Sequence, residues 1–208
     1  MPLYKTITPN SQTTVKIWKI TESYKDLIEA VNLKPESLER VIGMKSELHQ
    51  RGFLSVRHLL AAFGYEDSDL FYDANGKPHL KDGKHISITH SFQFSAVIVS
   101  DCSVGIDIEK QREKIRIIAH KFVDYEFEYL NESEADYVNK LTAIWCVKES
   151  LYKLFATPGL SFKDHCLVIP FGVDSDETVA WIDYKENKCR FQIRFLEFEG
   201  FTCAYVVA

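Results

Sequence analysis

The stretch VGIDIEK, residues 104–110, decides the fold assignment, because it completes a series of strand-like runs and places two carboxylates inside a buried pattern. In an extended strand alternate side chains share a face. Asp107 and Glu109 therefore point the same way, while Ile106 and Ile108 can face a core. Two carboxylates on one face repel each other, so a bound cation, a basic partner or a large pKa shift must offset the repulsion. A solvated edge strand with an acidic face is the alternative, and these seven residues leave it open.

Helical and strand-like segments surround this stretch. Apolar alternation predicts strands, whereas apolar spacing of three and four predicts helices. The predicted strands are 13–20, 85–90, 95–101, 103–109, 164–171, 178–184, 190–199 and 201–208. The predicted helices are 23–33, 37–64, a short one near 117–123, and 133–155, and Gly64 caps the second of them. We expect the three strands between 85 and 109 to be antiparallel neighbours.

The first and second halves of the chain show the same order of predicted elements: a helix, followed by strands that reach the end of that half. This repetition indicates a duplication. We therefore predict an α+β fold made of two similar halves, residues 1–100 and 101–208, related by a pseudo-twofold duplication. The active site is expected in the groove between the halves. If the groove replaces a subunit interface, the protein is a monomer.

Composition excludes several classes of protein. The 208 residues carry a formal net charge of −5, which argues against a general nucleic-acid binder. The five cysteines include no CxxC pair, so neither a zinc site nor a disulfide framework is indicated, and a cytoplasmic protein with reduced thiols is expected. No apolar run approaches the roughly 20 residues that span a bilayer, so no membrane association is expected.

Two further stretches carry groups that could do chemistry. In WCVKESLYK, residues 145–153, Trp145, Glu149 and Lys153 are spaced by four and share one helix face. Glu149 and Lys153 also form an ordinary stabilising pair, which is the alternative interpretation. The second stretch combines the loop NGKPHL, residues 75–80, with SITHS, residues 87–91.

In that second stretch, Lys77 lies between a flexible Gly76 and a rigid Pro78, and it can bring a cation to a flat or anionic ligand. Thr89 and His90 could donate hydrogen bonds to phosphate oxygens. A structural histidine and a common turn are the alternatives.

The order GKP, SITHS, VGIDIE and WxxKESxxK, with Trp145 following Asp107 by 38 residues, resembles the 4′-phosphopantetheinyl transferase superfamily, in its larger two-repeat, surfactin-synthetase activator-like type. The resemblance covers residues 76–153. The chain departs from the usual pattern at Thr89, where serine is common, and at Ser150, where alanine is commoner. Thr89 keeps the hydroxyl.

The resemblance implies transfer of the 4′-phosphopantetheine arm of coenzyme A to a serine of an apo acyl carrier protein or peptidyl carrier domain, with release of 3′,5′-ADP. It implies Mg²⁺ as cofactor, held by Asp107, Glu109 and Glu149. Glu149 is the third ligand or the general base, and Lys153 contacts the phosphate on which charge develops. Residues 1–100 would form the coenzyme A-binding half, and 101–208 would carry the magnesium strand and the catalytic helix.

Coenzyme A contacts are implied for the first half. Lys77 and Pro78 would flank the adenosine, Thr89 and His90 would hold phosphates, and a looser match offers Arg51 and Lys45 to the 3′-phosphate. Two other functions remain open: a Mg²⁺-dependent hydrolase of nucleotide pyrophosphates, and a non-catalytic module that binds coenzyme A or a carrier. Neither the carrier nor its docking surface can be read from the sequence.

Overall fold

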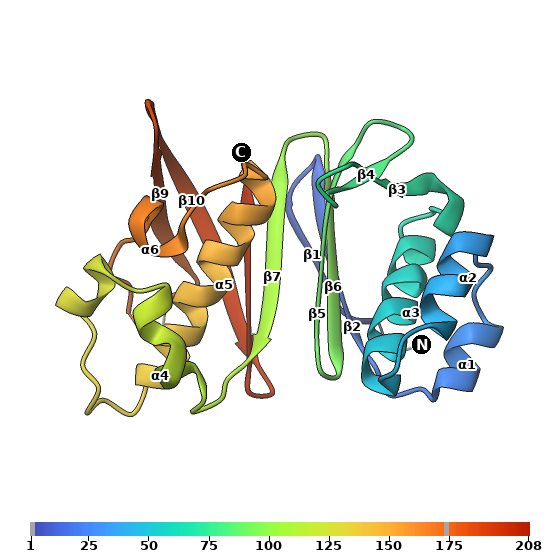
Figure 1. Ribbon diagram of the computed structural model, residues 1–208, viewed down its shortest axis with the longest axis horizontal. Coiled ribbons are helices and arrows are strands. Elements are labelled where there is room, and N and C mark those ends of the chain that lie inside the picture. Colours follow the sequence, from blue (N-terminus) through green and yellow to red (C-terminus); the bar gives the residue numbers. More distant parts are fainter. Residues whose placement is uncertain (1–2, 173–174) are drawn as a thin grey trace. The chain divides into compact units, whose positions relative to one another are not determined.

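The computed structural model describes residues 3–172 and 175–208 (Figure 1). It divides into two compact units, an N-terminal unit, Met1–Cys102, and a C-terminal unit, Ser103–Ala208. Each unit contains helices and an antiparallel sheet, so the predicted α+β class is confirmed.

The N-terminal unit is built on a four-stranded sheet with the order β1-β2-β6-β5. Its strands are β1 (Leu3–Asn10), β2 (Thr13–Lys19), β5 (His85–Ser91) and β6 (Phe94–Ser100), and each pair is antiparallel. The sequence predicts three of these strands and misses β1. That strand is mostly exposed or half-buried, so it lacks the apolar alternation that marks the others.

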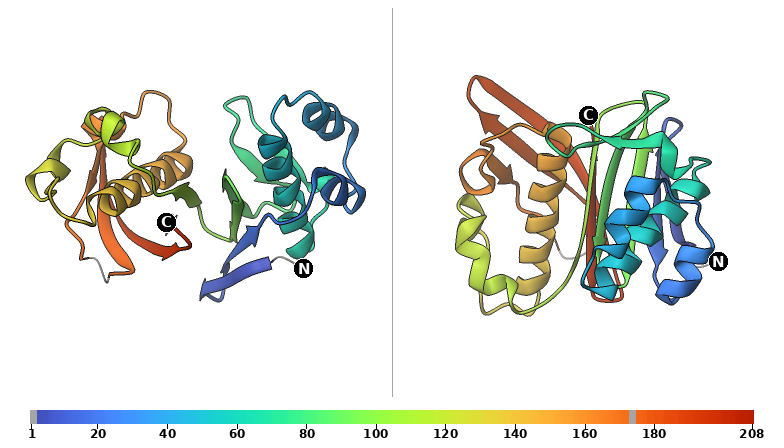
Figure 2. Two further views of the ribbon diagram at one scale, coloured as in Figure 1. Left: turned by 90° about the horizontal axis from the view of Figure 1, so that it is seen from below. Right: turned by 45° about the vertical axis from the view of Figure 1, so that its right-hand side comes forward.

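Three helices lie on the same side of this sheet, as Figures 1 and 2 show: α1 (Tyr24–Glu29), α2 (Pro35–Ile42) and α3 (Glu47–Ala62). The single helix predicted for 37–64 is wrong, because the chain leaves the helix at Gly43 and resumes it after Ser46. Gly64, with φ +87°, follows the end of α3 and adopts the left-handed conformation that terminates helices. A short 3₁₀ turn, η1 (Asp67–Asp69), leads to the hairpin of β3 (Leu70–Tyr72) and β4 (Pro78–Leu80).

The C-terminal unit is built on a five-stranded antiparallel sheet with the order β7-β11-β10-β9-β8. The strands are β7 (Val104–Lys110), β8 (Cys166–Val168), β9 (Glu177–Tyr184), β10 (Asn187–Phe198) and β11 (Phe201–Val207). The 19-residue helix α5 (Tyr137–Phe155) packs on β7 and β11 (Figure 1). Four short helices surround α5: α4 (Ile115–Ile118), η2 (Ala119–Lys121), η3 (Tyr125–Glu128) and α6 (Phe162–His165).

None of the helices within the described ranges is both long and apolar enough to cross a membrane.

The predicted pairing of β7 with its sequence neighbour is wrong. Strands β5 and β6 are antiparallel partners, as expected, but β7 pairs with β11 at the far end of the chain. The second edge of β6 is taken by β2, so no edge of β6 remains for β7. Alternation within a strand identifies the strand and its two faces, but it carries no information about distant partners.

The two units repeat one order of elements. In each, a strand is followed by a long helix and then by four strands, of which the last pairs with the first strand on one side and with the preceding strand on the other. The resulting orders are β2-β6-β5 with α3, and β7-β11-β10 with α5. Each sheet also shares an apolar core with its helices. In the N-terminal unit this core includes Leu27, Leu54, Leu59 and Val97, and in the C-terminal unit it includes Val147, Leu151, Ala204 and Val206.

Candidate active site

Helix α5 lies unusually close to strand β7 at Gly105. A Cβ atom added at this glycine would lie 1.9 Å from the carbonyl oxygen of Ser150 and 3.1 Å from the backbone nitrogen of Leu154. Any side chain here would push the helix away from the sheet. The glycine thus allows the helix backbone to lie directly on the strand, which brings the side chains of both elements together.

Asp107 and Glu109 occupy the same face of β7 as Gly105, because residues of a strand alternate between faces. Their cross-strand partners on β11 are Ala204 and Thr202. Ala204 belongs to the core that α5 covers, so this face is the helix side of the sheet. Asp107 is 4% exposed. The alternative of a strand whose acidic face is open to solvent therefore does not hold at this residue.

The ammonium of Lys153 offsets part of this buried negative charge. Its Nζ donates to Oδ1 of Asp107 at 2.7 Å and to the carbonyl oxygen of Ile106 at 3.0 Å. Desolvation, the largest single effect, lowers the pKa of Lys153, but the charge and hydrogen bond of Asp107 together with the charge of Glu149 outweigh it, so the pKa is raised. Asp107 and Lys153 therefore form a half-buried ion pair that links β7 to α5.

Glu149 lies one turn before Lys153 on the same helix and is half-buried. Burial, followed by the negative charge of Asp107, raises the pKa of Glu149 to about 7, and Glu109 adds to this effect while Lys153 opposes it. The Lys153 charge alone would lower the pKa of Glu149, but burial and the charges of Asp107 and Glu109 outweigh it, so the acidic face of β7 acts on this residue.

The three carboxylates supply the oxygen ligands that Mg²⁺ prefers, and their repulsion is of the kind that a dication relieves. As the side chains stand, no group of three or more His, Cys, Asp or Glu residues in the described part of the chain is arranged to hold a metal ion. Asp107 instead accepts from Lys153. The donor set fits a hard divalent cation in its chemistry.

Trp145 lies one helical turn before Glu149 on α5. Its ring packs edge-on against Phe122 and Phe162, with ring centroids 5.0 and 5.6 Å apart. Helical positions four apart drift by only about 40° per step, so Trp145 and Glu149 remain on adjoining parts of one face. Trp145 thus contributes to the packing of α5 against the neighbouring short helices, and its ring faces protein.

Thr89 and His90 lie near the end of β5 in the N-terminal unit. Thr89 is buried and His90 is exposed. The His90 ring lies against α3 at Gly52, where an added Cβ would come within 3.0 Å of its Nδ1 atom. A second glycine that allows close approach therefore lies beside a predicted phosphate contact.

Arg51 precedes Gly52 on α3, so it shares this region with His90. Its Nη2 donates to the carbonyl oxygen of Ile20 at 3.3 Å, while its Nε is buried and makes no hydrogen bond within the described residues. Lys45 lies at an exposed bend between α2 and α3. Arg51 thus adjoins in sequence the glycine that the His90 ring contacts, whereas Lys45 is a surface residue.

Lys77 and Pro78 lie where the β3–β4 loop enters β4. Asp73 organises this loop: its Oδ1 accepts from the backbone N–H groups of Asn75 and Lys77, at 2.8 and 3.0 Å. The backbone N–H of Asp73 in turn donates to the carbonyl oxygen of Lys77 at 3.0 Å. The side chain of Lys77 is therefore presented from an ordered turn.

The structure brings together Asp107, Glu109, Glu149 and Lys153 in the C-terminal unit. The residues predicted to bind coenzyme A, namely Lys45, Arg51, Lys77, Pro78, Thr89 and His90, all lie in the N-terminal unit. Sequence reasoning missed Gly105 as the residue that allows the first set to form. A glycine inside an otherwise apolar strand is the signal that could have found it.

Comparison with known proteins identifies the family of the chain. The sequence profile described as the 4′-phosphopantetheinyl transferase superfamily matches residues 103–206, which is half of the chain and lies within the C-terminal unit. The chain therefore belongs to the 4′-phosphopantetheinyl transferase superfamily and is an enzyme of that class. Over 180 residues it is 27% identical to the 4′-phosphopantetheinyl transferase gsp of Aneurinibacillus migulanus, covering 82% of this chain and 73% of that protein.

A substitution at Gly105 tests the close approach of α5 to β7. Gly105→Ala should lower the free energy of unfolding by about 3 kcal/mol, at the upper end of overpacking effects, because the added carbon meets helix backbone rather than a movable side chain. Thermal unfolding followed by circular dichroism measures the loss. Gly172→Ala is the control, since among the described residues its Cβ would meet only the Ser175 hydroxyl, at an ordinary 3.5 Å. Equal melting temperatures for both variants would show that the helix is not held this closely.

Proposed function

We propose that the chain transfers the 4′-phosphopantetheine arm of coenzyme A to a serine hydroxyl of an apo acyl or peptidyl carrier protein, with Mg²⁺ as cofactor, and releases 3′,5′-ADP. The observation that carries the proposal is the cluster of Asp107, Glu109 and Glu149 beside Lys153 where α5 lies on β7. Attack on a pyrophosphate requires that its negative charge be neutralised and that the hydroxyl proton be removed. Carboxylates and a lysine in one buried cluster match both needs.

In this proposal Asp107, Glu109 and Glu149 would hold the magnesium ion, which would act as a Lewis acid on the pyrophosphate oxygens. Glu149 has a second role, because the carboxylate of a half-buried residue beside the metal site can also accept the proton of the attacking serine. One carboxylate thus serves the metal and the incoming hydroxyl. This combination follows from the position of Glu149 on α5, opposite the acidic face of β7.

Lys153 would act on the phosphate that gains charge during transfer. Its ammonium is bonded to Asp107, so we propose that it turns from Asp107 toward the phosphate when coenzyme A binds. The flexible lysine side chain allows this change with α5 in place. Asp107 is then released to bind the cation, and the charge of the cation replaces that of the lysine beside the carboxylates.

Coenzyme A would be held by the N-terminal unit. Lys77 and Pro78 would flank the adenosine, Thr89 and His90 would bind phosphate oxygens, and Arg51 and, at the surface, Lys45 would receive the 3′-phosphate. The buried Nε of Arg51 and the placement of His90 against Gly52 support a preformed anion site there. Residues 1–100 would then form the coenzyme A-binding half and 101–208 the half that carries the metal and the catalytic helix.

We further propose that the two halves arose by duplication of one α+β unit. The repeated strand order supports this proposal. So does a shared detail: a buried serine on each long helix lies 2.9 Å from an oxygen of the last strand, Ser55 from Ser95 Oγ in β6 and Ser150 from Ala204 O in β11. Common local bonding at matching elements is expected of a repeated unit.

The duplication predicts the oligomeric state. If both halves of the site come from one chain, the protein should be a monomer of 24.0 kDa, because no second copy is needed to complete it. Multi-angle light scattering across a tenfold range of concentration measures this directly. A stable trimer of three times that mass would contradict a site completed within one chain.

A single assay separates the proposed function from its two alternatives. The protein is incubated with coenzyme A, Mg²⁺ and a purified apo carrier, and the carrier is then weighed by mass spectrometry while the nucleotide products are separated by chromatography. A carrier heavier by one phosphopantetheine arm, with an equal amount of 3′,5′-ADP, is expected. Loss of coenzyme A without gain of mass would identify a hydrolase, and no turnover would identify a binding module.

A further inference from the structure

The residue before Glu149 is a lysine that solvent cannot reach. The side chain of Lys148 is 0% exposed, and its Nζ donates to Oε1 of Glu126 at 2.8 Å. It also donates to the carbonyl oxygens of Phe122 at 2.7 Å and Phe162 at 3.1 Å. An ammonium carries three hydrogens, so these three acceptors satisfy it completely.

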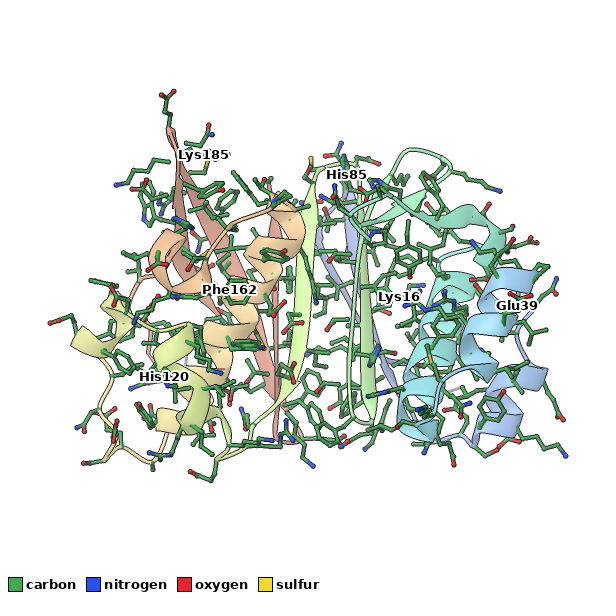
Figure 3. All side chains as sticks on the ribbon, viewed as in Figure 1. Lys16, Glu39, His85, His120, Phe162 and Lys185 are labelled. Atoms are coloured by element: carbon green, nitrogen blue, oxygen red, sulfur yellow. The ribbon has the colours of Figure 1, made fainter. Side chains whose placement is uncertain are left out.

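Glu126 is equally well bonded. Its Oε1 also accepts from the backbone N–H of Val168 at 2.9 Å, and its Oε2 accepts from the backbone N–H of Asp124 at 3.2 Å. The pair therefore joins α5 to η3, to the end of β8 at Val168, to the start of α6 at Phe162, and to Phe122, which follows η2. Figure 3 shows Phe162 beside α5, where its backbone carbonyl oxygen accepts a hydrogen bond from the Lys148 ammonium.

A second set of bonds holds the helix from the other side. The hydroxyl of Ser150 lies 2.9 Å from the carbonyl oxygen of Ala204 in β11, and Gly105 allows the helix backbone to touch β7. Successive helix residues are about 100° apart, so Lys148 and Ser150 point in nearly opposite directions. Glu149 lies between these two fixed points, and the helix can neither rotate about its axis nor slide without breaking one of them.

We propose that Lys148, through its buried pair with Glu126, is a positioning residue for the transfer reaction: it fixes the rotation of α5 and so places Glu149 and Lys153 against Asp107. This inference rests on the function proposed above, for which Glu149 and Lys153 are the reacting groups. A buried ion pair is no better for stability than well-packed apolar residues of the same volume. Its directional bonds, by contrast, define one orientation, and a displacement of about 1 Å in a reacting group can cost on the order of 100-fold in rate.

The test uses variants that separate stability from position. Lys148→Met leaves the Glu126 carboxylate buried without its cation, so the melting temperature should fall by about 10 °C. The double variant Lys148→Met with Glu126→Gln removes both charges and should recover most of that loss. Lys140→Met is the matched control, because Lys140 is a half-buried lysine of the same helix whose partners, Glu134 and Asp136, lie away from the cluster.

Transfer kinetics are then measured at a temperature well below every melting transition. We expect the double variant to keep a kcat about 10- to 100-fold below that of the wild type while KM for coenzyme A changes less than about twofold. The control should match the wild type. A double variant that regains both melting temperature and kcat would overturn the proposal, because the pair would then serve stability alone. If the double variant does not fold, Glu126→Gln takes its place under the same criterion.

A readout without coenzyme A or carrier separates this proposal from the proposed function. Mg²⁺ should raise the melting temperature of the wild type, since a ligand that binds only the folded state stabilises it, and should raise that of the double variant less. Equal rises would overturn the positioning role. Failure of the wild type to modify any carrier would instead contradict the proposed function, and the Mg²⁺ shifts would still decide whether Lys148 positions the carboxylates.

Discussion

Replacing Asp107 by alanine should abolish measurable transfer of the phosphopantetheine arm. The substitution removes the most buried carboxylate of the cluster and the partner of Lys153, so both the metal site and the position of the lysine are lost. Loss of one ligand among three in a site of this kind lowers the rate by more than about 1,000-fold. The rate of mass gain on an apo carrier at saturating coenzyme A and Mg²⁺ measures the effect.

The same variant should keep its fold. Asp107→Ala loses the ion pair with Lys153, but it also lowers the repulsion on Glu149, which then becomes the nearest acid to the Lys153 ammonium. These effects oppose each other, so the melting temperature of the metal-free protein should change by less than about 5 °C. An inactive protein that melts far lower would assign Asp107 a structural role. Retention of more than a tenth of the wild-type rate would remove it from the metal site.

Glu149→Gln should lower the rate by about 100- to 10,000-fold, with KM for coenzyme A nearly unchanged. An amide neither accepts the serine proton nor restores the charge that a cation needs. Titration with Mg²⁺ separates the two roles. If Glu149 is a metal ligand, high Mg²⁺ restores part of the transfer rate of the variant. If it is the base, high Mg²⁺ restores none of that rate. We expect partial recovery, because Glu149 serves both.

The stability of this variant gives an independent check. The fold binds the Glu149 proton more tightly than the unfolded chain does, since its pKa rises from 4.5 to about 7, so ionisation destabilises the metal-free protein as pH increases across that interval. Glu149→Gln should therefore melt higher than the wild type by a few °C at pH 8 and equally at pH 4. Glu134→Gln, on an exposed acid that bonds Lys140, should show neither effect. Near-wild-type activity at limiting Mg²⁺ would contradict both proposed roles of Glu149.

The local elements could be predicted from the sequence because their signals are local. Alternating apolar residues identify β2, β5 and β6, and the apolar spacing in 133–155 identifies α5, which begins four residues later than expected. The partner of β7 could not be predicted in this way. That partner, β11, lies about 100 residues away, and its choice depends on which sheet edges other strands have already filled.

The site could be predicted in part for the same reason. Asp107 and Glu109 share a face by the period of a strand, and Glu149 and Lys153 by the period of a helix, but nothing in either period shows that the two faces meet. Gly105 provides that link: the glycine itself is visible in the sequence, but the helix backbone that lies beside it is not. Lys148 was also beyond the sequence, because its partner Glu126 lies in a short irregular segment that carries no periodic pattern.

The claim that Asp107, Glu109 and Glu149 form one cation site can be tested directly with manganese as a probe. Crystals grown with coenzyme A and Mn²⁺, which takes the place of Mg²⁺ at oxygen sites, locate the ion by its anomalous scattering. We expect one strong peak about 2.2 Å from carboxylate oxygens of both β7 and α5, with the Lys153 ammonium moved from Asp107 toward a phosphate. A peak that contacts none of these three carboxylates, or a Lys153 still bonded to Asp107 beside bound coenzyme A, would contradict the shared cation site.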